Sequence, residues 1–188
     1  VAARLAKFDP EAATEIIARH KVRNIFFPPT ALRMLKAADT RIEGLRSVAS
    51  GGEPLGAEML DWGRDALGVT INEFYGQTEC NMVASSASHQ FPPRPGCIGK
   101  PVPGFDIGVI DDAGAESMGE GEIAIRKGAG SMMLGYWNNP AATAAKYRGD
   151  WLLTGDRGCW EAGYLRFIGR DDDVITTGAT ARAAAASV

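Results

Sequence analysis

The sequence is poor in the residues that build metal centres and disulfide frameworks. It has two histidines, His20 and His89, and three cysteines, Cys80, Cys97 and Cys159, whose separations match no common metal-binding pattern. A histidine-based metal site and a serine triad are therefore disfavoured. An odd number of scattered cysteines favours reduced thiols and a cytoplasmic location over a secreted, disulfide-bonded domain.

A basic surface and a long apolar run are also missing. The formal net charge is −3, whereas nucleic-acid-binding proteins usually carry a basic excess, so no nucleic-acid partner is expected. No stretch approaches the roughly 20 apolar residues of a membrane helix, and the chain does not start like a secretory signal. It begins without an initiator methionine, which indicates a piece of a longer protein.

The first half of the sequence alternates between helical and strand patterns. Helix boundaries are predicted at Asp9 and Pro10, at Thr30, and at Pro54 and Gly68. Strands are predicted over residues 22–27, 45–50 and 69–74. Strands separated by helices imply right-handed crossovers, so residues 1–90 are predicted to form part of a parallel α/β fold.

The second half changes to a pattern of short strands. Residues 91–104 are rich in proline and glycine and are predicted to be an irregular linker. Short strands are expected over residues 105–110, 122–126, 151–153 and 164–168, with a short helix opened by Asn139 and Pro140. Residues 91–170 are therefore predicted to be a small antiparallel β unit. The alanine-rich tail within 171–188 is expected to be disordered or weakly helical.

Two polar segments follow predicted strands of the first half, where ligands of parallel sheets usually bind. In Ser50-Gly51-Gly52-Glu53-Pro54 the paired glycines allow backbone to pass close to a flat ligand. A tight turn that binds nothing is the simpler interpretation of that segment alone. In residues 72–79, Thr78 can donate to a phosphate oxygen, Glu79 can hold a hard cation, and Tyr75 offers a flat face to a base or an acyl chain.

Two further segments lie in the second half. Asp156, in Thr154-Gly155-Asp156, is predicted to end a strand and could accept hydrogen bonds from both hydroxyls of a ribose. Arg170, in Gly169-Arg170-Asp171-Asp172-Asp173, could reach a ribose or a phosphate. Taken separately, each segment is also compatible with an ordinary polar turn.

The order and spacing of these motifs resemble those of the adenylate-forming enzymes, most closely the AMP-forming acyl-CoA synthetases of the medium-chain type. The resemblance runs from about Asp9 to Thr177. The matching segments are Gly51-Gly52-Glu53-Pro54, Tyr75-Gly76-Gln77-Thr78-Glu79, residues 94–101, residues 119–123, residues 135–140, Thr154-Gly155-Asp156 and Gly169-Arg170-x-Asp172-Asp173. The resemblance implies that the chain is part of that family's large domain, with an αβ subdomain followed by a small β-barrel-like subdomain.

The resemblance assigns roles to individual residues. Gly51, Gly52, Glu53 and Pro54 would contact adenine, with Tyr75, Gly76 and Gln77 in the same nucleotide site. Thr78 would contact the α-phosphate and Glu79 would bind Mg²⁺, as the two catalytic residues. Asp156 would bind the ribose hydroxyls with support from Arg170. Asp172 would sit at a hinge, and Phe27 and Gly76 would border the acyl pocket.

The implied reaction joins a carboxylate to coenzyme A through an acyl-adenylate, with ATP, Mg²⁺ and coenzyme A required. Glycine at position 76, where acetate-activating relatives carry tryptophan, favours a medium-chain or aromatic carboxylate. The family's upstream phosphate loop and its C-terminal lysine match nothing in these residues, so this stretch alone is expected to be inactive.

Other interpretations stay open. An adenylation domain that loads a carrier protein is the nearest, although Tyr75–Glu79 and residues 147–151 are more typical of the acyl-CoA branch. A non-catalytic nucleotide-binding remnant is the second. A Rossmann dehydrogenase is disfavoured because its G-x-G-x-x-G pattern is absent.

Overall fold

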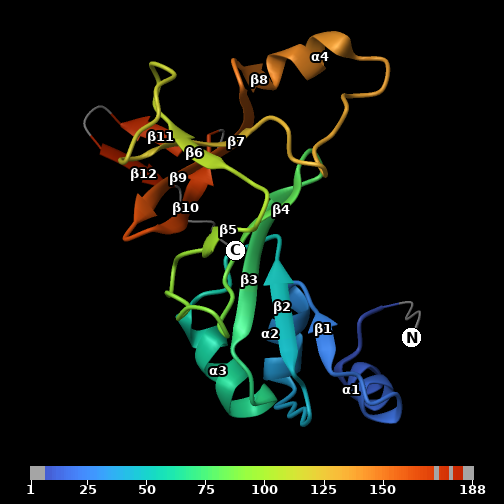
Figure 1. Cartoon of the computed structure of the whole chain (residues 1–188). Helices are drawn as coiled ribbons and strands as arrows, with labels where there is room; N and C mark the ends of the chain where they lie inside the picture. The colour runs from blue at the N-terminus through green and yellow to red at the C-terminus, as the bar shows by residue number, and fades with distance from the viewer. Residues whose placement is uncertain (1–6, 172–173, 178–179, 184–188) are drawn as a thin grey trace. The chain divides into compact units, whose positions relative to one another are not determined.

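The computed structural model describes residues 7–171, together with the backbone of residues 174–177 and 180–183. Its residues fall into two compact units. The first contains residues up to Phe74 and Ser86–Gly96, and the second contains Tyr75–Ser85 and the chain from Cys97 onward. The segment 75–85 thus belongs with the β-rich half, whereas the sequence analysis grouped it with residues 1–90. Figure 1 gives the elements of each unit.

The first unit is a parallel α/β layer. Its helices are α1 (Pro10–Arg19), α2 (Pro29–Ala37) and α3 (Ala57–Leu67), and its strands are β1 (Asn24–Phe26), β2 (Ser47–Gly51) and the start of β3 (Ile71–Gln77). β1 pairs with β2 and β2 with β3, both in parallel, so the predicted parallel sheet is confirmed. The three strands lie side by side and point the same way in Figure 1.

Two of the four predicted helix boundaries are confirmed. Asp9 caps α1 by accepting a hydrogen bond from the Ala12 N–H at 2.8 Å, and Gly68 ends α3. The predicted cap at Thr30 is wrong, because α2 begins at Pro29 and no side chain caps it. α3 begins at Ala57 rather than near Pro54, so the irregular glycine-rich turn after β2 is longer than predicted.

Buried aliphatic side chains from the helices and strands hold the first unit together. Each helix turns an apolar stripe toward the sheet, as its 3.6-residue period predicts. The fully or nearly fully buried members include Ile17, Leu32, Leu35, Val48, Leu60, Leu67 and Ile71.

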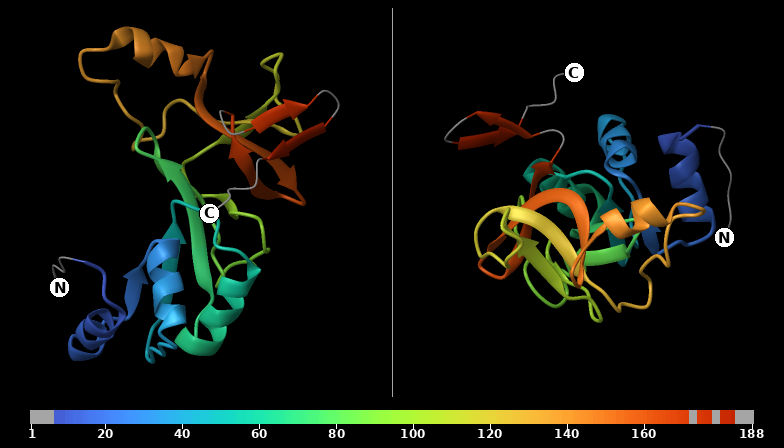
Figure 2. Two further views of the ribbon diagram at one scale, coloured as in Figure 1. Left: turned by 180° about the vertical axis from the view of Figure 1, so that it is seen from behind. Right: turned by 90° about the horizontal axis from the view of Figure 1, so that it is seen from above.

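The second unit is built on an antiparallel sheet. Its strands are β6 (Ile107–Ile110), β7 (Gly121–Arg126), β9 (Trp151–Glu161) and β10 (Tyr164–Arg170), in the order β10-β9-β7-β6, with β8 (Tyr147–Arg148) on β9. β4 (Asn81–Ser85) pairs with β5 (Lys100–Pro101), and α4 (Pro140–Ala145) is capped by Asn139. The main sheet is strongly curled, as the view from above in Figure 2 shows.

Two segments of the second unit lie within strands where the sequence analysis expected a loop or the end of a strand. β3 runs on through Gln77, so Tyr75 and Gly76 lie in a strand rather than in a loop after it. β9 continues to Glu161, so Asp156 lies in mid-strand and not at a strand end. In the tail, Thr180–Ala183 (β12) pairs antiparallel with Val174–Thr177 (β11), which contradicts the expected disorder or helix for residues 180–183.

Ile123 tests the core of the second unit. Its side chain is fully buried between neighbouring strands, so Ile123→Ala removes contacts and leaves a cavity. We expect the free energy of unfolding to fall by about 2–5 kcal/mol, measured by urea denaturation. The matched control is Met118→Ala, because the Met118 side chain is 81% exposed and its loss should change stability little. Equal effects of the two substitutions would contradict this assignment of the core.

Candidate functional site

In the first unit, buried polar groups lie where β2 and β3 approach the glycine-rich turn. Ser50 of β2 stands beside Glu73 of β3 in the parallel register. Oε1 of Glu73 accepts a hydrogen bond from the Leu55 N–H at 2.9 Å, which ties the turn to β3. Burial raises the pKa of the Glu73 carboxyl. The hydroxyl of Ser50 is buried and has no hydrogen-bond partner among the described residues.

The remaining predicted residues of the first unit have structural partners. Gly51 is the last residue of β2, and Gly52 and Pro54 lie in the turn after it. Glu53 forms an ion pair with Arg33 at 3.2 Å. The ring of Phe27 packs edge-on against Phe8, with 5.4 Å between the centroids. It joins the core there, so its acyl-pocket role remains a prediction.

In the second unit, Asp156 is the centre of a buried hydrogen-bond network. Its side chain is 5% exposed. Oδ2 accepts from the hydroxyl of Tyr75 at 2.6 Å and from Nε2 of Gln77 at 2.7 Å. Tyr75 and Gln77 share one face of β3 because side chains alternate along a strand. Burial, followed by the bond to Asp156, raises the pKa of the Tyr75 hydroxyl far above its usual value.

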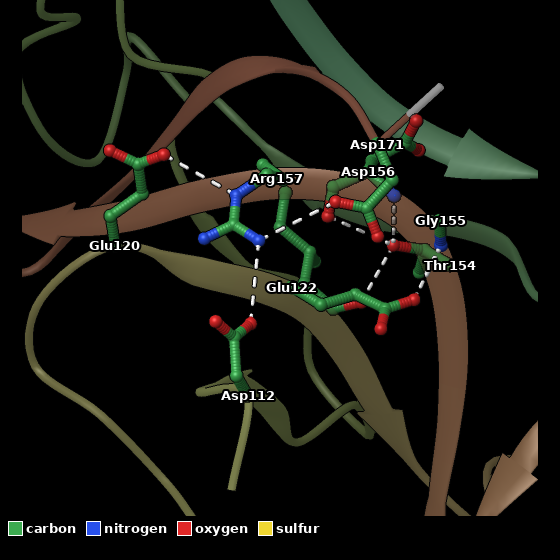
Figure 3. Close-up of polar contacts among 9 residues, drawn as sticks. Asp112, Glu120, Glu122, Thr154, Gly155, Asp156, Arg157 and Asp171 are labelled. Atoms are coloured by element: carbon green, nitrogen blue, oxygen red, sulfur yellow. Dashed lines mark hydrogen bonds and ion pairs between the residues drawn. The ribbon is translucent and has the colours of Figure 1, made fainter. Parts of the chain in front are cut away.

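A local irregularity of β9 presents Asp156 to this network. The pairing of β7 with β9 shifts register between Glu122 and Ala124, and Gly155 has a φ of +76°, which a residue with a side chain adopts at a cost. Oε1 of Glu122 accepts from the Gly155 N–H at 2.8 Å. Thr154 donates its hydroxyl proton to the Ile123 carbonyl at 2.6 Å and accepts from the Asp156 N–H at 3.1 Å. Figure 3 shows these contacts.

Arg157, the next residue on β9, joins three acidic segments. Its guanidinium lies 3.3 Å from Glu120, 3.5 Å from Asp171 and 3.8 Å from Asp112. Figure 3 shows the three carboxylates around it. The Asp171 N–H also donates to the Gly155 carbonyl at 3.0 Å. These contacts fasten the end of β10 to the strand that carries Asp156.

Arg170 lies opposite Asp156 in the register of β10 and β9. This position is compatible with the predicted support of a ribose site. Asp172, the predicted hinge residue, lies outside the described residues.

Thr78 and Glu79 lie in the turn between β3 and β4, as the sequence analysis expected of a polar loop. Thr78 is exposed and Glu79 is half-buried. The hydroxyl of Tyr136 donates to Oε1 of Glu79 at 2.6 Å. That bond lowers the pKa of the Glu79 carboxyl and raises the pKa of Tyr136 to about 12. Glu79 therefore remains an anion well below neutral pH.

The donor set around Glu79 suits Mg²⁺ in one specific way. No group of three or more His, Cys, Asp or Glu side chains within the described ranges could hold a metal ion. Mg²⁺ commonly uses one or two protein carboxylates together with substrate phosphates and water. A single ionised carboxylate beside the exposed hydroxyl of Thr78 fits that kind of site.

Gly76 is required by close packing. A Cβ atom placed on it would lie 1.9 Å from the carbonyl oxygen of Asn81, so any side chain would force the turn after β3 to move. The glycine thus has a structural reason, separate from the predicted room for an acyl chain, and the acyl-pocket role remains a prediction.

Residues 1–137 match the family model described as AMP-binding enzyme. The chain belongs to the AMP-binding enzyme family. It is 37% identical over 181 residues to the mitochondrial acyl-coenzyme A synthetase ACSM4 of Homo sapiens, covering 92% of this chain and 31% of that protein. It is 35% identical over 181 residues to the acetyl-coenzyme A synthetase of Bacillus subtilis (strain 168), covering 91% and 32%.

The fold is also similar to solved structures. The ATP-bound structure of MatB from Rhodopseudomonas palustris is similar with a TM-score of 0.85 at 29% identity, covering 96% of this chain and 37% of that one. The predicted α/β fold and the resemblance to adenylate-forming acyl-CoA synthetases are therefore confirmed. The chain spans about a third of the length of the relatives it matches.

Sequence reasoning missed the partners of the predicted site residues. Tyr136, Glu122 and Arg157 each contact or brace a predicted residue, yet none was assigned a role. The matched segments 135–140 and 119–123 contain Tyr136 and Glu122, so they were the available signals for these two residues. Arg157 lies in no matched segment, and its contacts depend on strand pairing, which the sequence does not reveal.

The raised pKa of Glu73 predicts a pH-dependent gain in stability for Glu73→Gln. A carboxyl whose pKa is raised by folding stabilises the fold when protonated, and this contribution is lost as the pH rises through the folded-state pKa. Glutamine keeps an oxygen for the Leu55 N–H but cannot ionise. The urea midpoint should therefore increase more at pH 7 than at pH 4.

Glu58→Gln is the matched control in the same unit. The hydrogen bond from Lys36 lowers the pKa of Glu58, so its contribution is present at neutral pH and is lost as the pH falls. The control should therefore reduce stability more at pH 7 than at pH 4. If both substitutions changed stability in the same direction between pH 4 and pH 7, the raised pKa assigned to Glu73 would be refuted.

Proposed function

We propose that the protein carrying this chain is an ATP-dependent, AMP-forming acyl-CoA synthetase. It activates a carboxylate as an acyl-adenylate with release of pyrophosphate, and then transfers the acyl group to the thiol of coenzyme A with release of AMP. The observation that carries the proposal is the buried Asp156 carboxylate, held through one oxygen by Tyr75 and Gln77. An ionised carboxylate has acceptor sites beyond these two bonds, and a ribose hydroxyl needs such an acceptor.

The remaining roles in this proposal are those that the resemblance to the family implies. Asp156 binds the ribose, with Arg170 beside it, and Tyr75 flanks the base while its hydroxyl holds Asp156. The turn Gly51-Gly52-Glu53-Pro54 contacts adenine. Asp172 serves as the hinge.

Catalysis of adenylate formation in this proposal is electrostatic. Thr78 donates to an α-phosphate oxygen and Glu79 holds Mg²⁺, which supplies positive charge to the phosphates when bound. Fixed donors and cations stabilise the charge that develops as the carboxylate attacks phosphorus. The low pKa of Glu79 keeps that ligand ionised. This stretch alone is proposed to be inactive, because it includes neither the phosphate loop nor the C-terminal lysine of the family.

Two other functions remain possible for the same site. An adenylation domain for a carrier protein shares the first half-reaction, and a non-catalytic remnant would only bind nucleotide. The relatives named as acyl-coenzyme A and acetyl-coenzyme A synthetases favour coenzyme A as acceptor.

No helix among residues 7–171 is long and apolar enough to cross a membrane. A cytoplasmic location stays a proposal, since the human relative is named as mitochondrial.

Calorimetric titration with a non-hydrolysable acyl-AMP analogue tests the site in the full-length protein. Asp156→Ala should weaken binding by about 100-fold, because a ribose loses its charged, buried acceptor. Asp112→Ala is the matched control, since Asp112 is an aspartate of the same unit whose side chain is 98% exposed. Unchanged binding by the folded Asp156→Ala protein would refute the ribose assignment.

A panel of carboxylates tests the proposed substrate class. If position 76 leaves room in the acyl pocket, kcat/KM for hexanoate or benzoate should exceed that for acetate by about tenfold or more, as expected for a few added methylene groups in an apolar pocket. The measurement is pyrophosphate release by the full-length protein. A preference for acetate would overturn this choice of substrate while leaving the adenylation chemistry intact.

A further inference from the structure

The segment Gly135-Tyr136-Trp137 matched the family but received no function. Within the second unit, its tyrosine side chain reaches the proposed metal ligand, since the Tyr136 hydroxyl lies 2.6 Å from Oε1 of Glu79. The two residues are separated by 57 positions in the sequence. A contact of this length has to be held by the structure on both sides.

The loop that carries Tyr136 is attached to the β3–β4 turn by its backbone. The Met133 N–H donates to the carbonyl of Glu79 at 2.7 Å. The Ser131 hydroxyl donates to the carbonyl of Cys80 at 3.2 Å. These two bonds do not involve the phenol, so the loop stays fastened when the Tyr136 hydroxyl is removed.

The other side of Tyr136 is attached to α4. Its N–H donates to the hydroxyl of Thr143 at 2.9 Å, and that hydroxyl donates to the carbonyl of Asn139 at 3.0 Å. Asn139 also caps α4 by accepting from the Ala142 N–H at 3.0 Å. These bonds fix the backbone of Tyr136, from which its phenol reaches Glu79.

Besides the Tyr136 hydroxyl, the side chain of Glu79 interacts with its own backbone N–H. It is half-buried, it lies in a turn, and it has three rotatable side-chain bonds. A phenol donates one strong hydrogen bond to an ionised carboxylate. That bond occupies Oε1 and orients Oε2.

We propose that Tyr136 is a positioning residue for Glu79, whose carboxylate it holds in the orientation that coordinates Mg²⁺ on the bound nucleotide. This inference rests on the proposed function, because it assumes that Glu79 is the metal ligand. Tyr136 itself contacts neither the metal nor the nucleotide. Its effect is confined to the metal-dependent part of ATP binding.

The test is calorimetric titration of the full-length protein with ATP over a series of MgCl₂ concentrations. Tyr136→Phe should raise the Mg²⁺ concentration for half-maximal enhancement of ATP binding about three- to tenfold, as expected for one lost hydrogen bond to a half-exposed carboxylate. ATP affinity without Mg²⁺ should be unchanged. If Tyr136 were only structural, its substitution would change the ATP affinity without Mg²⁺ and the Mg²⁺ dependence together.

Two further variants sharpen the result. Tyr164→Phe makes the same chemical change at a tyrosine of the same unit whose ring faces Lys100 instead, and it should leave the Mg²⁺ dependence of ATP binding unchanged. In a Glu79→Gln background, Tyr136→Phe should have no additional effect, because a residue that acts through another is non-additive with it.

The outcomes separate the two levels of inference. If wild type shows Mg²⁺-dependent ATP binding and Tyr136→Phe shows the same Mg²⁺ dependence, the positioning role is wrong while the proposed function stands. Equal weakening with and without Mg²⁺, or an additive effect in the Glu79→Gln background, also overturns it. If wild type binds no ATP at any Mg²⁺ concentration, the proposed function itself fails.

Discussion

A buried carboxylate must be satisfied, and much of the second unit is arranged around that requirement at Asp156. Leaving such a charge without donors costs several kcal/mol, on the order of 3–5 for a broken buried pair. Tyr75 and Gln77 supply two donors to one oxygen. Gln77 also donates to the Thr154 carbonyl at 2.9 Å, so the same amide fixes the backbone that carries the aspartate. The site is thus preorganised by residues that lie far from Asp156 in sequence.

The strand irregularity at Gly155 is the second part of this arrangement. Side chains alternate along a strand, and a shift of one residue would exchange the faces of Asp156 and Arg157. Asp156 then would meet the acidic group formed by Asp112, Glu120 and Asp171, and Arg157 would lose it. Charge therefore disfavours the slipped register. The hydrogen bonds that the Gly155 and Asp156 N–H groups donate to Glu122 and Thr154 fix the irregular backbone directly.

The sequence predicted those parts of the fold that depend on local signals. Asp9 with Pro10 marks a helix start, and Gly68 marks a helix end, because caps and stops act over a few residues. The prediction failed where pairing decided the outcome. Trp151–Glu161 contains a Thr-Gly-Asp segment with the composition of a turn, yet β7, β8 and β10 all pair with it and keep it a strand. The end of β3, residues 75–77, was likewise expected to be a loop and is a strand.

The candidate site shows the same division between local and long-range information. Motif order selects Tyr75, Glu79 and Asp156 as candidates, because each stands in a characteristic local segment. It does not reveal that Tyr75 bonds to Asp156, or that Tyr136 bonds to Glu79, since these contacts depend on which strands and loops meet. Both are phenol–carboxylate bonds of 2.6 Å, but their surroundings differ. The first holds the buried carboxylate of Asp156, whereas the second restrains the half-exposed carboxylate of Glu79. A hydroxyl ligand needs only one acceptor oxygen, which a buried carboxylate such as that of Asp156 can provide. Mg²⁺ demands near-ideal octahedral geometry, so a half-exposed carboxylate such as that of Glu79 must be held in orientation before it can serve as a ligand.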